Sequence, residues 1–221
     1  FEDNGIKFFN RDGQKFSSEL EQRIETKLTQ EMIAVESINL GKATRMNDAQ
    51  GRYIEFCKSS FTNLDLRNLS ILLDCANGAT YSVAPKVFSE LGAKVDVIGS
   101  SPDGININQH CGSTSPEFLK EEIMKGSHDL GIAFDGDGDR VLIVTSDGEI
   151  LDGDDILYIL SKNLPSDSGV IGTLMTNKAL ELYFQKNNIS FLRTDVGDKY
   201  VLHRLIEESW LLGGEPSGHI F

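Results

Sequence analysis

The order of hydrophobic and polar residues alternates between two patterns along most of the chain. Short continuous apolar runs, such as residues 70–74, are typical of strands buried on both faces. Longer stretches in which apolar residues recur at helical spacing, as Leu20, Ile24 and Leu28 do, are typical of helices with one buried face. The two patterns together predict strands and helices that follow one another in turn.

From residue 70 onward, a strand precedes nearly every helix in this pattern. We expect strands at residues 5–9, 70–74, 94–98, 130–134, 141–145, 169–174, 190–194 and 210–212. We expect helices at residues 16–30, 81–91, 116–125, 154–163, 177–186 and 199–209, with caps at Ser17 or Ser18, Gly92 and Ser115. Residues 31–51 lack clear periodicity and are interpreted as a linker. The sequence predicts the α/β class, with layered α/β/α domains and mixed, largely parallel sheets.

Composition and charge narrow the class of protein. Of the 221 residues, 39% are hydrophobic and 25% are charged, which is typical of a chain with a packed core. The net charge is −13 and no basic cluster stands out, so nucleic-acid binding is not expected. No apolar run approaches the roughly 20 residues that cross a bilayer, and the N-terminus has no signal-peptide pattern. We therefore expect a soluble cytoplasmic protein without a membrane partner.

The cysteines give one further indication of the compartment. Cys57, Cys75 and Cys111 are odd in number and widely spaced, with no Cys-x-x-Cys pair. This usage is typical of reduced thiols in the cytosol.

The most specific chemistry lies at residues 135–140, which we call the aspartate loop. Asp135, Asp137 and Asp139 are spaced by two, so on an extended backbone their carboxylates share one side. The intervening glycines allow the loop to curl around a small ion. Hard oxygen donors suit Mg²⁺, and Arg140 adds a rigid fork for a phosphate or carboxylate. The loop therefore predicts a divalent-metal site.

Two other interpretations of the aspartate loop, an EF-hand and a solvated acidic turn, fit the sequence less well. A dinucleotide site at residues 77–80 fits less well too. An EF-hand would need Gly at its sixth position and Glu at its twelfth, where this chain has Arg140 and Ser146. A solvated acidic turn would need only one Asp-Gly pair. Residues 77–80 follow a strand and open a helix, but they lack the Gly-x-Gly-x-x-Gly pattern of dinucleotide sites.

A second polar cluster lies at residues 215–219, which we call the Glu-Ser-His segment. Glu215, Ser217 and His219 again alternate, so they present an acceptor, a hydroxyl and an imidazole on one side. Such a set suits sugar hydroxyls beside a phosphate. A Gly-Pro turn with incidental polar residues explains the same spacing equally well.

Residues 194–199 form a third candidate, at the turn between a strand and a helix. Gly197, Asp198 and Lys199 are placed where a helix N-terminus can meet an anion. Ordinary capping by Asp198 accounts for the spacing at least as well. Lys7 by itself is typical of a surface lysine.

Taken together, these residues resemble the α-D-phosphohexomutase superfamily. Residues 135–140 match its metal loop in full and residues 214–219 match its sugar-recognition loop, in the same order and separation. Within the superfamily the resemblance is greatest to the phosphoglucosamine mutases, through residues 111–114, 129–134, 172–177 and 196–201. It covers nearly the whole chain and is weakest from residue 31 to residue 68.

The resemblance implies a reaction and a set of residue roles. The reaction is the interconversion of glucosamine 6-phosphate and glucosamine 1-phosphate through a phosphoserine and a bisphosphate intermediate, on the route to bacterial wall precursors. The implied cofactor is Mg²⁺ and the implied partner is the sugar phosphate, while oligomeric state stays open. The implied roles are Mg²⁺ binding by Asp135, Asp137 and Asp139, substrate contact near the metal by Arg140, sugar binding by Glu215, Ser217 and His219, acid–base help by Lys7, and lining of the cleft by Gly197, Asp198 and Lys199.

Departures from the family pattern limit what the chain is expected to do alone. The family's catalytic serine, in a Ser-His-Asn-Pro loop, and its phosphate-gripping last domain have no counterpart in these residues. We expect residues 1–62 to hold the end of a first domain and a linker, 63–152 a second domain, and 153–221 an incomplete third. A piece of this kind would lack mutase activity. A phosphomannomutase/phosphoglucomutase, or a non-catalytic module that binds Mg²⁺ and sugar phosphate, are the alternatives.

Overall fold

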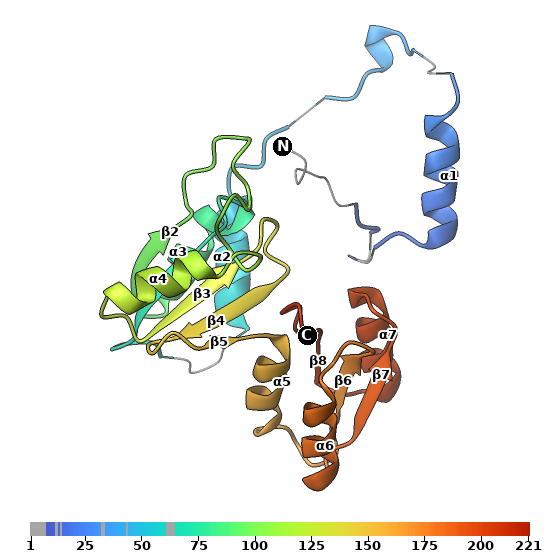
Figure 1. The fold of residues 1–221 in the computed structure, drawn as a ribbon. Coiled ribbons are helices and arrows are strands. Elements are labelled where there is room, and N and C mark those ends of the chain that lie inside the picture. The colour runs from blue at the N-terminus through green and yellow to red at the C-terminus, as the bar shows by residue number, and fades with distance from the viewer. Residues whose placement is uncertain (1–7, 12, 14, 32–33, 43, 61–64) are drawn as a thin grey trace. The chain divides into compact units, whose positions relative to one another are not determined.

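The computed structural model describes residues 8–11, 13, 15–31, 34–42, 44–60 and 65–221 (Figure 1). The chain divides into two compact units, one within residues 4–49 and one that contains residues 50–221. Both sheets lie in the second unit, which therefore carries the fold that positions the candidate site.

The first unit contains helix α1 (Ser18–Leu28) and a short 3₁₀ turn η1 (Ser37–Asn39). Ser17 caps α1, because its side chain accepts a hydrogen bond from the amide of Leu20, which confirms the expected helix and its cap. No residue of α1 is buried. Of the expected strand at residues 5–9, residues 5–7 lie outside the described residues, and so does the candidate Lys7.

Helix α2 (Ala49–Ser59) was not expected, and part of it falls in the predicted linker. Ile54 is its one buried residue, so the helix buries no broad apolar stripe. Tertiary contacts hold it instead. Gln50 donates to the carbonyl of Ser82 at 2.7 Å, and Lys58 forms an ion pair with Glu90.

The first sheet has five strands in the order β2-β1-β3-β4-β5. Its strands are β1 (Ser70–Asp74), β2 (Lys94–Ile98), β3 (Leu130–Phe134), β4 (Val141–Thr145) and β5 (Ile150–Leu151). The pairs β1–β2 and β1–β3 are parallel, whereas β3–β4 and β4–β5 are antiparallel. The sheet is therefore mixed, as the sequence predicts.

Helices cover both faces of this sheet, so the interior strand β1, which lies between β2 and β3, is buried on both sides. Ile71 and Leu73 pack toward Ala84 of helix α3 (Ala84–Glu90), while Leu72 packs toward helix α4 (Glu117–Lys125) on the other face. Successive side chains of a strand point to opposite faces, which explains the continuous apolar run.

The second sheet has three parallel strands in the order β7-β6-β8. Its elements are β6 (Val170–Thr173), β7 (Phe191–Thr194), β8 (Leu212–Gly213), α5 (Gly153–Ser161), α6 (Lys178–Lys186) and α7 (Asp198–Glu208). Helices α5 and α6 pack with β6 around the fully buried Phe184, and α7 packs on the opposite face through Val201. An α/β/α layer results.

Several element ends differ from the sequence prediction. The expected helix at 81–91 is a 3₁₀ turn η2 (Ala79–Ser82) followed by α3, because Pro85 stands in the first turn of α3. Pro116, not Ser115, is the N-cap of α4, and no side chain caps that helix. The domain boundaries at 62/63 and 152/153 stay predictions.

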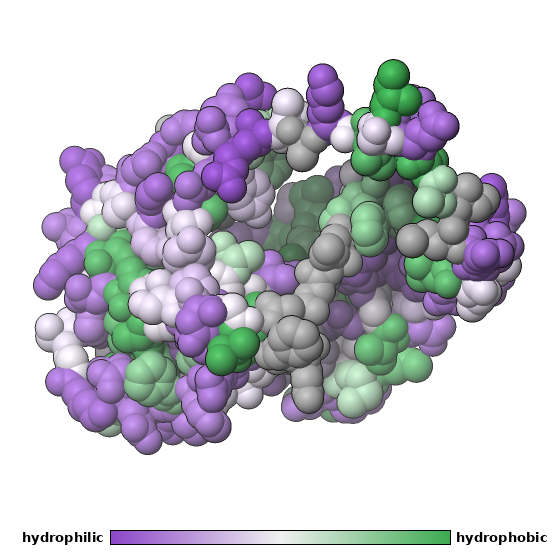
Figure 2. Space-filling view, turned by 90° about the horizontal axis from the view of Figure 1, so that it is seen from above, coloured by the Kyte–Doolittle hydropathy of each residue, from purple (hydrophilic) through white to green (hydrophobic). Residues whose placement is uncertain are grey.

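Figure 2 shows mainly hydrophilic side chains over the visible surface, with apolar side chains in scattered places. No helix among the described residues is long and apolar enough to cross a membrane. All three cysteines are free thiols.

Thiol labelling tests the packing of the first sheet. Cys75 and Cys111 are buried, and burial raises the pKa of both thiols to about 11. Since the thiolate is the reactive form, only about one molecule in a thousand carries it at pH 8. We expect iodoacetamide to modify Cys57 of α2 first, with Cys75 and Cys111 protected until urea unfolds the protein, as read by peptide mass spectrometry. Labelling of all three cysteines at one rate in the native protein would contradict this packing.

Candidate functional site

The aspartate loop connects β3 to the antiparallel strand β4. Carboxylate oxygens of Asp135, Asp137 and Asp139 lie within 4.8 Å of one another. The sequence prediction placed the three carboxylates on one side of an extended backbone. In the structure the backbone of the loop turns back on itself instead. The amide of Gly138 donates to the carbonyl of Asp135 at 3.1 Å, and Gly138 has a φ of +77°. The carboxylates therefore converge because the loop curls, which glycine permits.

The burial of the three carboxylates is graded. Asp135 is 1% exposed, whereas Asp137 is exposed and Asp139 is half-buried. Burial raises the pKa of Asp135 above the usual range, and hydrogen bonds from Arg140 oppose that rise. A hard cation beside this set of oxygen donors would relieve the crowding of charge, so the residues present fit Mg²⁺.

Arg140 is the last residue of the aspartate loop, and its side chain points back at Asp135 and Asp139. Its Nε donates to Asp135 Oδ2 at 2.8 Å and lies 3.7 Å from Asp139 Oδ1, and its amide donates to Asp135 Oδ1 at 3.1 Å. Its side chain is 39% exposed, so part of the guanidinium still faces solvent. Arg140 thus serves first to hold Asp135, and an anion would meet the exposed part of its fork.

The Glu-Ser-His segment forms a tight hairpin after β8. An isolated antiparallel bridge joins Gly214 to Ile220, and the amide of Glu215 donates to the carbonyl of His219 at 3.0 Å. Glu215 is buried, Ser217 is exposed, and the imidazole of His219 stacks on Phe221 with ring centroids 4.7 Å apart. The hairpin therefore presents these side chains from a fixed backbone.

The aspartate loop and this hairpin meet directly. The amide of Val141 donates to the carbonyl of Gly218 at 3.1 Å, and a Cβ on Gly218 would lie 2.0 Å from the carbonyl oxygen of Val141. His219 Nδ1 lies 3.8 Å from Asp139 Oδ2. Two motifs about 80 residues apart in the sequence are thus brought into one site.

The third candidate cluster joins the site through Glu215. Glu215 Oε1 accepts a hydrogen bond from the amide of Gly197 at 2.9 Å. Gly197, at φ +133°, is the N-cap of α7, and Asp198 accepts from the amide of Lys199 rather than capping the helix. Lys199 is exposed, with Nζ 5.0 Å from the ring centroid of Tyr200. The structure links Gly197 to the site, while Lys199 reaches the surface beside it.

Sequence reasoning missed the segments that support the aspartate loop. Residues 75–80 and 105–113 pack behind it, and the amide of Ala79 donates to the carbonyl of Gly136 at 2.8 Å. A Cβ on Gly78 would lie 2.1 Å from the same carbonyl oxygen. The Asn77-Gly78 pair was the available signal, since glycine is required where two backbones approach so closely.

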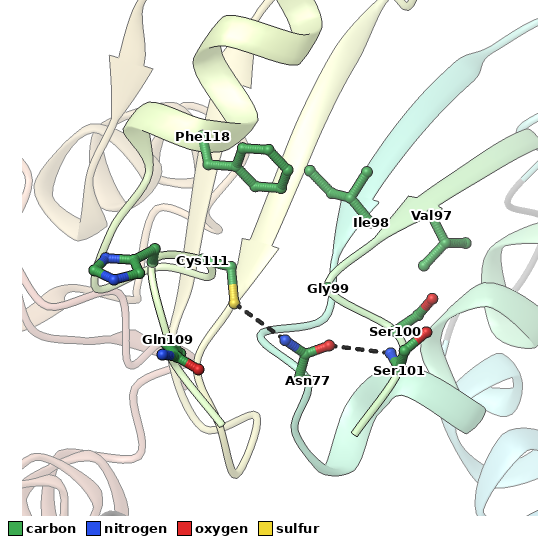
Figure 3. A pocket seen from close by; sticks show the side chains of 10 residues that line it. Asn77, Val97, Ile98, Gly99, Ser100, Ser101, Gln109, Cys111 and Phe118 are labelled. Carbon is green, nitrogen blue, oxygen red and sulfur yellow. Dashed lines mark hydrogen bonds between the residues drawn. The ribbon is translucent and has the colours of Figure 1, made fainter. Parts of the chain in front are cut away.

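A cavity of about 550 Å³ opens beside these supports, at the carboxyl ends of β1 and β2 (Figure 3). Asn77 spans it, accepting from the amide of Ser101 at 3.0 Å while its amide nitrogen lies 3.6 Å from Cys111 Sγ. Phe118 and Ile98 form an apolar part of the wall. Asn77 therefore ties together the segments that lie behind the aspartate loop.

Two family models match successive parts of this chain. The model described as phosphoglucomutase/phosphomannomutase, alpha/beta/alpha domain II, matches residues 51–148, and that of domain III matches residues 152–221. The chain belongs to this family. The domain II match contains the aspartate loop, and the domain III match contains the Glu-Ser-His segment.

Relatives of known sequence and structure agree with the family assignment. The chain is 55% identical to the phosphoglucosamine mutase of Legionella pneumophila (strain Corby) over 225 aligned residues, covering 100% of this chain and 50% of that protein. A phosphoglucomutase/phosphomannomutase family protein from Burkholderia thailandensis superposes with a TM-score of 0.65 at 27% identity, covering 78% of this chain and 38% of that one. The resemblance predicted from the sequence is confirmed.

A more distant neighbour carries ligands. N-acetylphosphoglucosamine mutase of Aspergillus fumigatus, solved with GlcNAc-6P and magnesium, superposes with a TM-score of 0.59 at 22% identity, covering 77% of this chain and 40% of that one. At this identity the likeness shows the shared fold alone. The chain spans about half the length of the curated relatives it matches.

Replacing Gly218 with alanine tests the contact between the two loops. The added Cβ would overlap the carbonyl of Val141, and the residue has a φ of +92°, so we expect Gly218→Ala to lower the free energy of unfolding by roughly 1–3 kcal/mol. Gly51→Ala is the control, because nothing lies within 4 Å of its Cβ position in α2 and alanine favours a helix by roughly 0.5–1 kcal/mol. Urea denaturation followed by circular dichroism measures both. Equal stability of Gly218→Ala and the wild type would argue against the contact.

Proposed function

We propose that this chain is the Mg²⁺-binding and sugar-binding part of a phosphoglucosamine mutase, which interconverts glucosamine 6-phosphate and glucosamine 1-phosphate. The observation that carries the proposal is the meeting of the aspartate loop with the Glu-Ser-His segment. His219 lies beside Asp139 of the loop, and Gly218 bonds to Val141, the residue that follows the loop. A metal site beside a set of sugar-hydroxyl partners suits transfer of a phosphoryl group to or from a sugar. The 55% identity to a phosphoglucosamine mutase supports glucosamine phosphate as the substrate.

In this proposal, Asp135, Asp137 and Asp139 are the metal ligands. Their carboxylate oxygens already lie within 4.8 Å of one another, and the magnesium in the Aspergillus fumigatus neighbour supports the choice of ion. Bound Mg²⁺ would neutralise charge on a transferred phosphoryl group. Arg140 holds the buried Asp135 and offers its exposed edge to a phosphate oxygen of the substrate.

The remaining residues would bind and orient the sugar. Ser217 is exposed at the tip of the hairpin and donates or accepts a hydrogen bond with a hydroxyl group. His219 stands between Phe221 and Asp139, so its imidazole is oriented toward the metal side of the site. The carboxylate of Glu215 would accept a hydrogen bond from a sugar hydroxyl. One of its oxygens already accepts from the amide of Gly197. Asp198 and Lys199 would line the same cleft.

The complete reaction would need groups that these residues do not supply. A phosphoserine donates the phosphoryl group in the resemblance on which the proposal rests, and a bisphosphate forms. Lys7 of this chain, which lies outside the described residues, would assist as acid or base. The chain matches half the length of its curated relatives, so we propose that the 221 residues bind Mg²⁺ and sugar phosphate without turning over. Detectable turnover by the purified 221-residue chain would overturn that part.

Replacing Asp137 with asparagine tests the metal assignment. The substitution removes one charged oxygen donor, so we expect Mg²⁺ affinity to fall by about tenfold or more in isothermal titration calorimetry. Asp147→Asn is the matched control, because it makes the same change of charge at an exposed turn ten residues along the chain. Unchanged affinity in Asp137→Asn would remove the metal site from the proposal.

Competition among hexose phosphates tests the substrate. With the intact gene product, we expect kcat/KM for glucosamine 6-phosphate to exceed that for glucose 6-phosphate and mannose 6-phosphate by about tenfold or more. The expectation rests on the 55% identity to a phosphoglucosamine mutase. A coupled assay of each 1-phosphate product measures this. Preference for glucose or mannose phosphate would favour a phosphoglucomutase/phosphomannomutase, a name that the matched family also carries.

Absence of turnover from the intact gene product, with Mg²⁺ and sugar phosphate still bound, would favour a binding module. The coding sequence upstream of Phe1 separates the same alternatives, since a Ser-His-Asn-Pro loop there favours the enzyme.

A further inference from the structure

Asp74 is a buried carboxylate outside the set of residues proposed above. It ends β1 and is 0% exposed. Its Oδ1 accepts from the amide of Ala76 at 3.0 Å, and its Oδ2 accepts from the amide of Gly112 at 2.7 Å. Burial raises the pKa of Asp74, and these two hydrogen bonds oppose the rise. Burying a carboxylate costs free energy, and the two amide hydrogen bonds offset part of that cost.

The two amides belong to separate segments, and Asp74 joins them. Ala76 lies in the turn after β1, whereas Gly112 lies in the long connection before α4. A further bond links the same segments, since the amide of Asn108 donates to the carbonyl of Ala76 at 2.8 Å. We call the two segments, residues 75–80 and 105–113, the cradle.

Each half of the cradle holds the backbone of the aspartate loop or its entry. From the first half, the amide of Ala79 donates to the carbonyl of Gly136 at 2.8 Å. From the second half, the amide of Ser113 donates to the carbonyl of Phe134 at 2.8 Å. The hydrogen bonds therefore form a closed ring that starts and ends at Asp74 and passes through the loop.

Close packing makes this ring stiff. A Cβ on Gly136 would lie 2.7 Å from Ile107 Cδ1 and 2.9 Å from Asn108 Nδ2, and one on Gly112 would lie 2.5 Å from the carbonyl oxygen of Phe134. Ala76 and Asn108 also have left-handed backbones, with φ of +53° and +57°. Such conformations persist where surrounding bonds over-determine them. Here Asp74 accepts from the amide of Ala76, and the carbonyl of Ala76 accepts from the amide of Asn108.

We propose that Asp74 is a positioning residue of the metal site, whose carboxylate fixes the cradle and thereby the curvature that brings Asp135, Asp137 and Asp139 together. Asp74 does not touch the metal in this account; it acts through the backbone of the cradle. The inference rests on the metal site proposed above. It requires an anion with two acceptors, because an amide side chain would turn one N–H donor toward a backbone N–H donor.

Asp74→Asn is the first test, with Mg²⁺ affinity of the 221-residue chain measured by isothermal titration calorimetry. We expect affinity to fall by about 10- to 100-fold, the effect typical of losing a group that orients metal ligands. Asp129→Asn is the matched control. Asp129 also accepts from a backbone amide, that of Ser70 at 2.7 Å, but at the opposite end of β1 and β3. We expect its Mg²⁺ affinity to match the wild type.

Amide hydrogen exchange separates positioning from a general loss of stability. In Asp74→Asn we expect faster exchange at Gly112, Ser113 and Ala79, while amides of the second sheet such as Ile171 stay at the wild-type rate. Uniformly faster exchange, with unchanged Mg²⁺ affinity in the folded molecules, would make Asp74 a stabilising residue only and overturn the inference.

A second variant covers the case in which Asp74→Asn does not fold. Ala79 is the first residue of η2, a position that accepts proline, and Gly78 before it is extended. Ala79→Pro removes the bond from the cradle to Gly136 but leaves Asp74 intact, so we expect a similar loss of Mg²⁺ affinity. Wild-type Mg²⁺ affinity in this variant would overturn the role inferred for Asp74 and leave the proposed metal site unaffected. A wild-type chain that binds no Mg²⁺ would overturn the metal site and this inference together.

Discussion

The crowding of three carboxylates in the aspartate loop is the constraint on which the rest of the site depends. Asp135, Asp137 and Asp139 place like charges within 4.8 Å of one another, and one of them is almost fully buried. Such an arrangement is unfavourable unless cations compensate it and the backbone cannot relax. Arg140 supplies one positive charge from within the chain. The fold supplies the rigidity, through close contacts with backbone segments that approach the loop from behind.

The position of that loop within the fold explains how a second sheet can contribute to the same site. Parallel strands place the loops that follow them at one edge of a sheet, where ligands of α/β proteins usually bind. The aspartate loop follows β3 of the first sheet, and the hairpin with Glu215 and His219 follows β8 of the second. A backbone contact between Val141 and Gly218 then joins the two sheets. Only glycine fits at residue 218, because a Cβ there would lie 2.0 Å from the carbonyl oxygen of Val141. Two loops that are far apart in the sequence are thus brought together because each follows a strand of its own sheet.

Family membership and physical geometry support different parts of the account. The family models and the 55% identical mutase support the fold class and the reaction proposed for the intact protein. The geometry supports the grouping of the three proposed metal ligands, the orientation of His219 and the anchoring of Glu215 on Gly197. The chain spans half the length of the relatives it matches, so the reaction is proposed for the intact protein.

The sequence by itself determined the elements with strong local signals, while tertiary structure decided those that depend on distant partners. The apolar run of β1 and the Asp-Gly repeat of the aspartate loop predicted a buried strand and a metal site, since burial and ligand chemistry are encoded in residue type and spacing. Helix α2 was missed because contacts with Ser82 and Glu90 hold it rather than an apolar stripe. The supporting role inferred for Asp74 was likewise invisible, because a lone aspartate at a strand end has no local pattern. Only folding brings its two amide partners, 36 residues apart in the chain, to one carboxylate.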